Sequence, residues 1–348
     1  MRAVVLTGTQ TLQVREAPKP EISDGEVLLR SRAVSICGTD MRIYRSGHTK
    51  LPANTPRILG HEMAGEVVQV GRGVTGVKPG DRVAVAPNFG CGVCRMCQRG
   101  WFHLCPDYGA IGLTEDGGMA EFVRIPRIPV QQGCLLPMPE GLSFEQAALN
   151  EPFACVYNGY TKCPTNPGDI ALIVGAGPIG IMNMMMCRLA GAARIIVADL
   201  ASARLQQARA LGADHTVDSS RDDLVKSVLE LTGGHGADVI ITACPSPAVQ
   251  EQVTALAADH ARVNLFGGLP KGSPPVRMDS NAIHYKELVI TGSHGCCTFH
   301  CEKALALQGS GAINLTPLIT QVFDLAQTQQ AMDAALAGRG LKTLIRPS

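Results

Sequence analysis

Aromatic residues, net charge and long apolar runs are all scarce in this chain of 348 residues. Aromatic side chains make up 4% of it, and the formal net charge is +1. A nearly neutral chain without blocks of like charge argues against a broad surface for nucleic acid or anionic lipid. Its longest apolar stretch, interrupted by Asn183, Arg188 and Arg194, falls short of the roughly 20 residues of a membrane-spanning helix. We therefore expect no nucleic-acid partner and no membrane association.

The first residues, MRAVVLTGTQTLQV, lack the apolar core of a signal peptide. Thirteen cysteines without a secretion signal indicate a reducing compartment, where thiolates bind metals. We expect a soluble, cytoplasmic protein. Hydrophobic residues make up 45% of the chain, enough for sizeable cores, and the length suits two domains of about 100–200 residues each.

Four cysteines lie close together, with gaps of two, two and seven residues between Cys91, Cys94, Cys97 and Cys105. Short gaps let neighbouring thiolates face one centre, and the longer gap lets the chain return with the fourth. This pattern predicts a closed structural zinc site in a lobe at about 88–107. Unpaired thiols or two disulfides are the alternative, but such spacing rarely arises by chance.

The organisation of the chain changes near residue 167. The first 150 or so residues contain apolar strands between Gly/Pro turns, which predicts a mostly β, barrel-like region. Strands and helices then alternate, as in a parallel sheet covered on both faces. A helix and a strand after about residue 297 are expected to return to the first domain.

A glycine-rich turn follows the apolar strand expected at 170–174. Gly175, Gly177 and Gly180 have the G-x-G-x-x-G spacing, and Asp199 ends the next strand 22 residues after Gly177. This context predicts a dinucleotide site in which Asp199 accepts bonds from a ribose 2′-hydroxyl and favours NAD over NADP. Arg204 could neutralise a 2′-phosphate or simply lie on a solvated helix face. The predicted cofactor-binding residues are Gly175, Gly177, Pro178, Ile179, Gly180, Asp199 and Arg204.

A second metal site is predicted from separated residues. Cys37 lies in SICGTD, His61 and Glu62 in LGHEMAG, and Glu151 in LNEPF. One thiolate, one imidazole and one carboxylate form a catalytic zinc site with an open fourth position. Each residue alone is weak evidence for a metal site. The prediction becomes stronger because the same chain also contains the cysteine lobe and the glycine turn.

Together these motifs resemble the zinc-dependent medium-chain dehydrogenase/reductase family along nearly the whole chain. The acidic residues and the lobe are similar to its polyol branch, which includes sorbitol, threonine and galactitol-phosphate dehydrogenases. The matching elements are CGTD at 37–40, GHE at 60–62, VKPGDRV at 77–83, the lobe at 91–105, GGMAEF at 117–122, EP at 151–152, GAGPIG at 175–180 and LGAD at 211–214.

The resemblance implies an α/β protein with two domains. Residues 1–152 and 293–348 would form a GroES-like, mostly β catalytic domain, and 153–292 a Rossmann domain. The implied activity is NAD-dependent oxidation of a secondary alcohol in a polyol or sugar-derived substrate. Each subunit would hold one catalytic and one structural zinc, in a homodimer or homotetramer.

The resemblance also implies roles for individual residues. Cys37 and His61 would be fixed zinc ligands, and Glu62 and Glu151 compete for the third position. The other glutamate would have a catalytic role, in which it holds the zinc-bound water or approaches the metal transiently. Asp40 would orient the ring of His61.

Proton transfer would begin at Thr39, unless its hydroxyl is bonded to nearby backbone. Arg42 stands where several relatives have a relay histidine, so His48 or water could take that part. His294 would lie near the nicotinamide. We expect Cys296, Cys297 and Cys301 to be buried thiols and not a third metal site.

Two other functions fit the sequence. A threonine-type or polyol-phosphate dehydrogenase would use Arg42 and the loop at 44–50 to bind a charged substrate. A non-enzymatic zinc-binding module would have no use for Cys37, His61 or the glycine turn.

Overall fold

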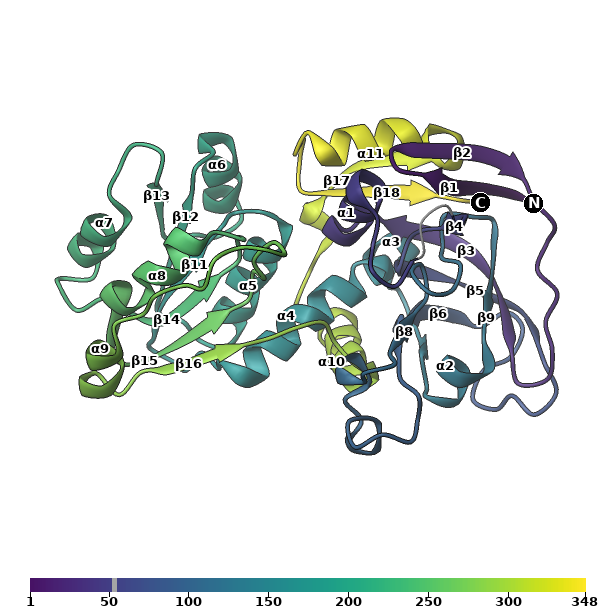
Figure 1. Ribbon diagram of the computed structural model, residues 1–348, viewed down its shortest axis with the longest axis horizontal. Coiled ribbons are helices and arrows are strands. Elements are labelled where there is room, and N and C mark those ends of the chain that lie inside the picture. The colour runs from purple at the N-terminus through teal and green to yellow at the C-terminus, as the bar shows by residue number, and fades with distance from the viewer. Residues whose placement is uncertain (52–54) are drawn as a thin grey trace. The chain divides into compact units, whose positions relative to one another are not determined.

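The computed structural model describes residues 1–51 and 55–348 (Figure 1). The chain divides into two compact units, Met1–Ala154 with Gly295–Ser348 and Cys155–His294. Both divisions lie two residues beyond the boundaries expected from the sequence. Within the described residues, none of the helices is long and apolar enough to cross a membrane.

The first unit is built around a mixed sheet whose strand order is β10-β6-β5-β3-β18-β17, with β9 also paired to β3. Strand β3 is almost entirely buried because it contacts β5, β9 and β18. The antiparallel pairing of β18 with β3 joins the C-terminal segment to this unit. The strands are β3 (Val27–Ser35), β5 (Glu62–Val70), β6 (Arg82–Val85), β9 (Phe122–Ile125), β10 (Leu135–Pro137), β17 (Ile319–Asp324) and β18 (Lys342–Arg346).

Two smaller sheets and several short helices complete the first unit. A sheet of order β2-β1-β4 lies at its N-terminal end, and β7 pairs with β8 beside the cysteine lobe. Helix α4 (Asn150–Lys162) continues from the first unit into the second. The other elements are β1 (Arg2–Gly8), β2 (Thr11–Glu16), β4 (Arg57–Ile58), β7 (Asn88–Phe89), β8 (Gly109–Ala110), α1 (Gly38–Ser46), α2 (Arg127–Gln131), α3 (Phe144–Ala148), α10 (Thr298–Gly309) and α11 (Thr328–Leu336).

The second unit contains a six-stranded parallel sheet of order β13-β12-β11-β14-β15-β16. Leu172 and Ile173 are neighbours on β11 and face opposite sides, yet both are fully buried, so both faces of the sheet are covered. The strands are β11 (Ile170–Val174), β12 (Arg194–Asp199), β13 (His215–Asp218), β14 (Ala237–Thr242), β15 (Ala257–Leu265) and β16 (Val289–Gly292).

The strand order of this sheet reverses between β11 and β14, which creates the switch point where doubly wound sheets bind ligands. The α/β fold predicted from the strand–helix alternation is confirmed. The helices of this unit are α5 (Pro178–Leu189), α6 (Ser202–Ala210), α7 (Leu224–Leu231), α8 (Pro247–Leu256) and α9 (Ser280–Tyr285).

Candidate functional site

The four cysteines of the lobe face one another. Their sulfur atoms all lie within 4.8 Å of each other, with Cys91 and Cys97 4.0 Å apart and Cys94 and Cys105 3.7 Å apart. These separations exceed a disulfide bond of about 2.05 Å. They match the roughly 3.8 Å expected between sulfurs that surround zinc tetrahedrally at about 2.3 Å. The donor set therefore fits a structural zinc.

The backbone of the lobe favours thiolates at this centre. The amide of Cys91 donates to the sulfur of Cys105 at 3.4 Å, and the amide of Cys97 donates to that of Cys94 at 3.5 Å. Amides of Val93 and Cys94 lower the pKa of Cys91 to about 7. A Cβ at Gly90 would lie 2.3 Å from the sulfur of Cys97, so glycine is needed beside the cluster.

A second group of donors forms in the first unit from Cys37, His61 and Glu62, whose donor atoms lie within 4.8 Å of one another. Cys37 caps the N-terminus of α1, and His61 and Glu62 stand at the start of β5. The sequence separates Cys37 from the other two by more than twenty residues, and the fold brings all three together. A thiolate, an imidazole and a carboxylate at this spacing fit zinc.

Asp40 supports this group from the first turn of α1. It is fully buried, accepts the amide of Cys37 at 2.9 Å, and lies 3.4 Å from Nδ1 of His61. Burial lowers the pKa of His61, but Asp40 and Cys37 more than offset this and hold the pKa well above its usual value. The surroundings of the imidazole are thus anionic, which favours a cation at the group.

Lys342 is a member of this site that the sequence interpretation missed. Its Nζ donates to Glu62 Oε2 at 2.5 Å and to the carbonyl of Ile36 at 3.2 Å. Both charged side chains are buried, with relative exposures of 4% for Lys342 and 1% for Glu62. Burial lowers the pKa of Lys342, but Glu62 and Cys37 offset this and raise it overall. A lysine between apolar residues of a predicted strand was the signal available in the sequence.

Glu151 occupies a different position from Glu62. It is buried in the first turn of α4, and the sulfur of Cys296 lies 3.7 Å from its Oε1. Among the described residues, the donor group with Cys37 and His61 contains Glu62 and does not contain Glu151. Glu151 nevertheless raises the pKa of Lys342, so it contributes to the charge around the site.

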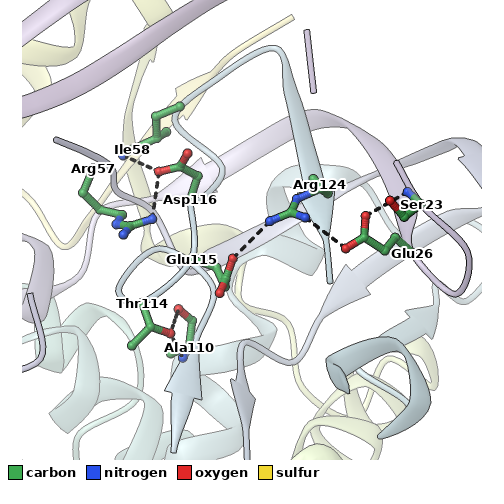
Figure 2. Close-up of polar contacts among 9 residues, drawn as sticks. All are labelled: Ser23, Glu26, Arg57, Ile58, Ala110, Thr114, Glu115, Asp116 and Arg124. Atoms are coloured by element: carbon green, nitrogen blue, oxygen red, sulfur yellow. Dashed lines mark hydrogen bonds and ion pairs between the residues drawn. The ribbon is translucent and has the colours of Figure 1, made fainter. Parts of the chain in front are cut away.

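The segment before His61 is fixed by the loop at 115–118 (Figure 2). Asp116 Oδ1 accepts the amide of Ile58 at 3.1 Å and Nη1 of Arg57 at 3.2 Å. The amide of Gly117 donates to the carbonyl of Ile58 at 2.8 Å. A Cβ on Gly117 would lie 2.5 Å from the carbonyl oxygen of Gly60, so the GG pair allows this close approach.

Arg124 holds the same loop from the other side. Its guanidinium bridges Glu26, at 3.0 Å, and Glu115, at 3.5 Å (Figure 2). Glu26 also accepts the amide of Ser23 at 2.9 Å. Strand β9 is thereby tied to the loop that precedes β3 and to the loop that fixes His61.

The residues predicted for proton transfer lie on α1 and the loop after it. Thr39 is half-buried and Arg42 is exposed; they are three residues apart and so share one helix face. His48 Nδ1 accepts the amide of Lys50 at 3.1 Å. Burial lowers the pKa of His48, and Arg42 and Lys50 lower it further.

The glycine turn has the geometry that its spacing predicts. Gly175 has a φ of 111°, and a Cβ on Gly180 would lie 1.7 Å from the carbonyl oxygen of Gly175. A Cβ on Gly177 meets no described atom within 4 Å, so the backbone there faces open space. Pro178 and Ile179 form the first turn of α5, whose N-terminus carries unpaired amides suited to a phosphate.

Asp199 lies at the end of β12 beside this turn. Its Oδ2 accepts the amide of Ala176 at 2.7 Å, and its Oδ1 accepts that of Ala201 at 2.9 Å. A carboxylate has about four acceptor positions, so it can accept further hydroxyl groups. Arg204 is half-buried on α6, and the carbonyl of His294 accepts Nδ2 of Asn158 at 3.4 Å.

The three cysteines near α10 are all buried, as expected. Cys296 and Cys301 have their sulfur atoms 3.7 Å apart. The sulfur of Cys297 lies 3.1 Å from Nδ1 of His300, which also accepts the amide of Cys297. Cys297 and His300 thus cap α10.

Two family models match most of the chain. Residues 23–139 match the alcohol dehydrogenase GroES-like domain, and residues 178–308 match the zinc-binding dehydrogenase family. Sorbitol dehydrogenase of Bacillus subtilis (strain 168) is 32% identical over 352 residues, which cover 100% of this chain and 98% of that protein. L-threonine 3-dehydrogenase of Pyrococcus abyssi is 35% identical over 338 residues, covering 95% and 93%.

Solved structures have the same fold. A protein of Sinorhizobium meliloti 1021 described as a zinc-binding dehydrogenase, determined bound to NADP, is 32% identical with a TM-score of 0.91, and the match covers 99% of both chains. The chain therefore belongs to the polyol dehydrogenase branch of the zinc-dependent medium-chain dehydrogenase/reductase family, as an oxidoreductase that acts on a CH–OH group with NAD(P).

Proposed function

We propose that Cys37, His61 and Glu62 hold the catalytic zinc of an enzyme that oxidises a secondary alcohol of a polyol or sugar-derived substrate with NAD. The observation that carries this proposal is the convergence of these three donors within 4.8 Å. Glu62 is chosen over Glu151 because it belongs to that group. In this proposal the first unit is the catalytic domain and the second binds the dinucleotide.

The chain's own residues prepare the site for a metal and a substrate hydroxyl. Asp40 engages Nδ1 of His61, which leaves Nε2 as the metal donor. Lys342 holds the carboxylate of Glu62 in place through the bond from its Nζ to Oε2. Zinc bound by these residues would lower the pKa of a substrate hydroxyl, and a bound nicotinamide would accept the hydride.

Proton removal is assigned to Thr39. It is half-buried in the first turn of α1, two residues from Cys37. A hydroxyl in this place can accept the substrate proton and pass it to the cofactor ribose or to water. Nδ1 of His48 is occupied by the amide of Lys50, so His48 contributes to the relay through Nε2 alone.

NAD is the proposed cofactor because Asp199 would meet a 2′-phosphate with a negative charge. The proposed assembly is a homodimer or homotetramer. Strand β16 is the edge of its sheet, and Val289 on it is 50% exposed, so the edge can pair with a second subunit. Thirteen cysteines without a disulfide among the described residues support a cytoplasmic location.

Metal analysis and a substrate panel test this proposal. The wild-type protein should hold two zinc ions per chain and oxidise sorbitol or a related polyol with NAD. A Cys37→Ser variant should retain one zinc and lose activity. Cys187→Ser is the matched control, since it changes a buried thiol in the second unit whose bond with Thr165 a serine can keep. Full activity of Cys37→Ser would overturn the ligand assignment.

A charged substrate is the second candidate, favoured by the positive charges near α1. Arg42 and Lys50 both lie close enough to His48 to lower its pKa. Arg42 is exposed and could bind a phosphate or a carboxylate of the substrate, whereas Nζ of Lys50 already donates to the carbonyl of Tyr108 at 2.7 Å and would add positive charge only. Rates with sorbitol, L-threonine and a polyol phosphate distinguish the candidates, and higher kcat/KM with a charged compound would favour this second one.

A further inference from the structure

The end of β13 places a second carboxylate beside Asp199. Asp199 and Asp218 are direct partners in the parallel register of β12 and β13, and the amide of Ser219 donates to the carbonyl of Asp199 at 3.0 Å. Neighbouring strands lie about 4.8 Å apart. Both carboxylates therefore stand at the carboxyl edge of the sheet, where doubly wound folds bind dinucleotides.

Asp218 is held as an anion and engages the hydroxyl groups around it. Ser202 Oγ donates to its Oδ2 at 2.7 Å, and the amide of Ser220 donates to its Oδ1 at 3.1 Å. The hydroxyl of Ser220 also donates to Oδ1. These bonds lower the pKa of Asp218. The two serine hydroxyls are thus directed to Asp218 and are not available to a phosphate.

The cations near Asp218 compensate little of its charge. Arg221 Nε lies 3.8 Å from Asp218 Oδ2, but its side chain is 79% exposed and solvated. Arg209 on α6 donates to Thr216 at 2.9 Å. Arg204 is half-buried on the same helix. A 2′-phosphate next to Asp199 would therefore lie close to two carboxylates, with no arginine held in place to neutralise its charge.

We propose that Asp218 is a second specificity-determining residue, which acts with Asp199 to exclude a 2′-phosphate and so select NAD. This inference rests on the proposed use of NAD. Asp218 acts in two ways: it adds a negative charge near the 2′ position, and it holds Ser202 and Ser220 away from any phosphate. We expect its contribution to be about tenfold in affinity, the size of a partly screened charge interaction.

Calorimetry with two nucleotides that differ by one phosphate isolates this effect. The probes are AMP and adenosine 2′,5′-bisphosphate, titrated into the full-length zinc-loaded protein at low ionic strength. Asp218→Asn keeps the shape and acceptor oxygen of the side chain but removes its charge. The ratio of the two dissociation constants should shift about tenfold toward the bisphosphate in this variant. At about 0.5 M salt the shift should shrink, because the interaction is electrostatic.

Asp222→Asn is the matched control. Asp222 is exposed on the turn after β13, and its removal changes the net charge by the same amount. We expect its ratio to shift by less than about threefold. Equal shifts in the two variants would overturn the specific role of Asp218, as would no shift in Asp218→Asn.

Kinetic ratios separate this inference from the function on which it rests. If the wild-type enzyme has a higher kcat/KM with NAD and Asp218→Asn leaves the NAD/NADP ratio unchanged, the role of Asp218 fails and NAD use stands. If the wild-type enzyme uses NADP at least as well as NAD, both fail. An NAD preference that falls in Asp218→Asn, together with the calorimetric shift, supports both.

Discussion

Replacing Lys342 with methionine tests the electrostatic organisation of the proposed zinc site. Methionine keeps the apolar stem of the side chain and removes its charge. Glu62 would then keep a carboxylate that is 1% exposed and has lost its cationic partner. Removal of one member of a buried ion pair costs about 3–5 kcal/mol. We expect the first unit of the metal-free protein to be destabilised by about that amount.

Zinc should reduce this cost, because a divalent cation beside Glu62 offsets the unpaired charge. The assay is urea unfolding followed by the fluorescence of Trp101, the single tryptophan, which lies in the first unit. Each variant is measured after chelation and after zinc is restored. The difference between Lys342→Met and wild type should be larger in the chelated protein. Lys342→Arg keeps the charge and should recover part of the lost stability.

A double-mutant cycle supplies the result that would refute this reasoning. If the pair is coupled, Lys342→Met with Glu62→Gln should be more stable in the chelated protein than the sum of the single effects predicts. A double variant whose loss equals that sum would show that Lys342 and Glu62 act independently. Equal losses in chelated and zinc-loaded protein would show that the metal does not share the charge of Glu62.

Further predictions concern the other parts of the site. Gly180→Ala places a Cβ 1.7 Å from the carbonyl oxygen of Gly175, so we expect the nucleotide affinity measured by calorimetry to fall at least tenfold. An unchanged affinity would contradict the close packing of α5 on the glycine turn. Asp116→Ala removes two hydrogen bonds from the segment before His61, so it should cost about 1–2 kcal/mol of stability and speed zinc loss to a chelator. Asp116→Asn should recover much of the stability and of the zinc retention. Equal rates of zinc loss in the wild type and the two variants would show that Asp116 does not fix this segment. Cys94→Ser should reduce the zinc content from two to one and destabilise the lobe before it changes the chemical step, and a retained second zinc would contradict the four-thiolate site. Burial raises the pKa of Asp214, but Arg188 and the amide of Ile195 lower it overall. The ionised Asp214 therefore stabilises the fold fully above the unfolded pKa of about 3.9, and this stabilisation is lost as pH falls through the folded pKa. Asp214→Asn should lower the melting temperature at pH 7 and have little effect near pH 2, and a larger effect at pH 2 than at pH 7 would refute the direction of this pKa shift.

Local features of the site could be predicted from the sequence because each depends on a few neighbouring residues. The spacing of Gly175, Gly177 and Gly180 predicts a tight turn with close helix–strand packing, and the structure has that turn. The lobe cysteines are close in the chain, so their convergence needs no knowledge of the fold. The change from β strands to strand–helix alternation also gave the fold class.

Other features depend on contacts between distant segments. Lys342 and Glu62 are 280 residues apart, and a lysine in an apolar strand does not reveal its partner. The choice between Glu62 and Glu151 depends on where α4 begins relative to β5, which spacing in the sequence does not fix. The part played by Asp116 was missed for the same reason, since its bonds go to a strand 58 residues earlier.

The pairing of β18 with β3 has a consequence for synthesis on the ribosome. Residues 155–294, the whole second unit, leave the ribosome before the chain that completes the first unit exists. The first unit must keep β3 without its β18 partner until residues 342–346 emerge. Because Lys342 is on β18, Glu62 gains its cationic partner only after the whole second unit has been made. The nucleotide-binding half is thus able to fold early, and the metal-binding half matures last.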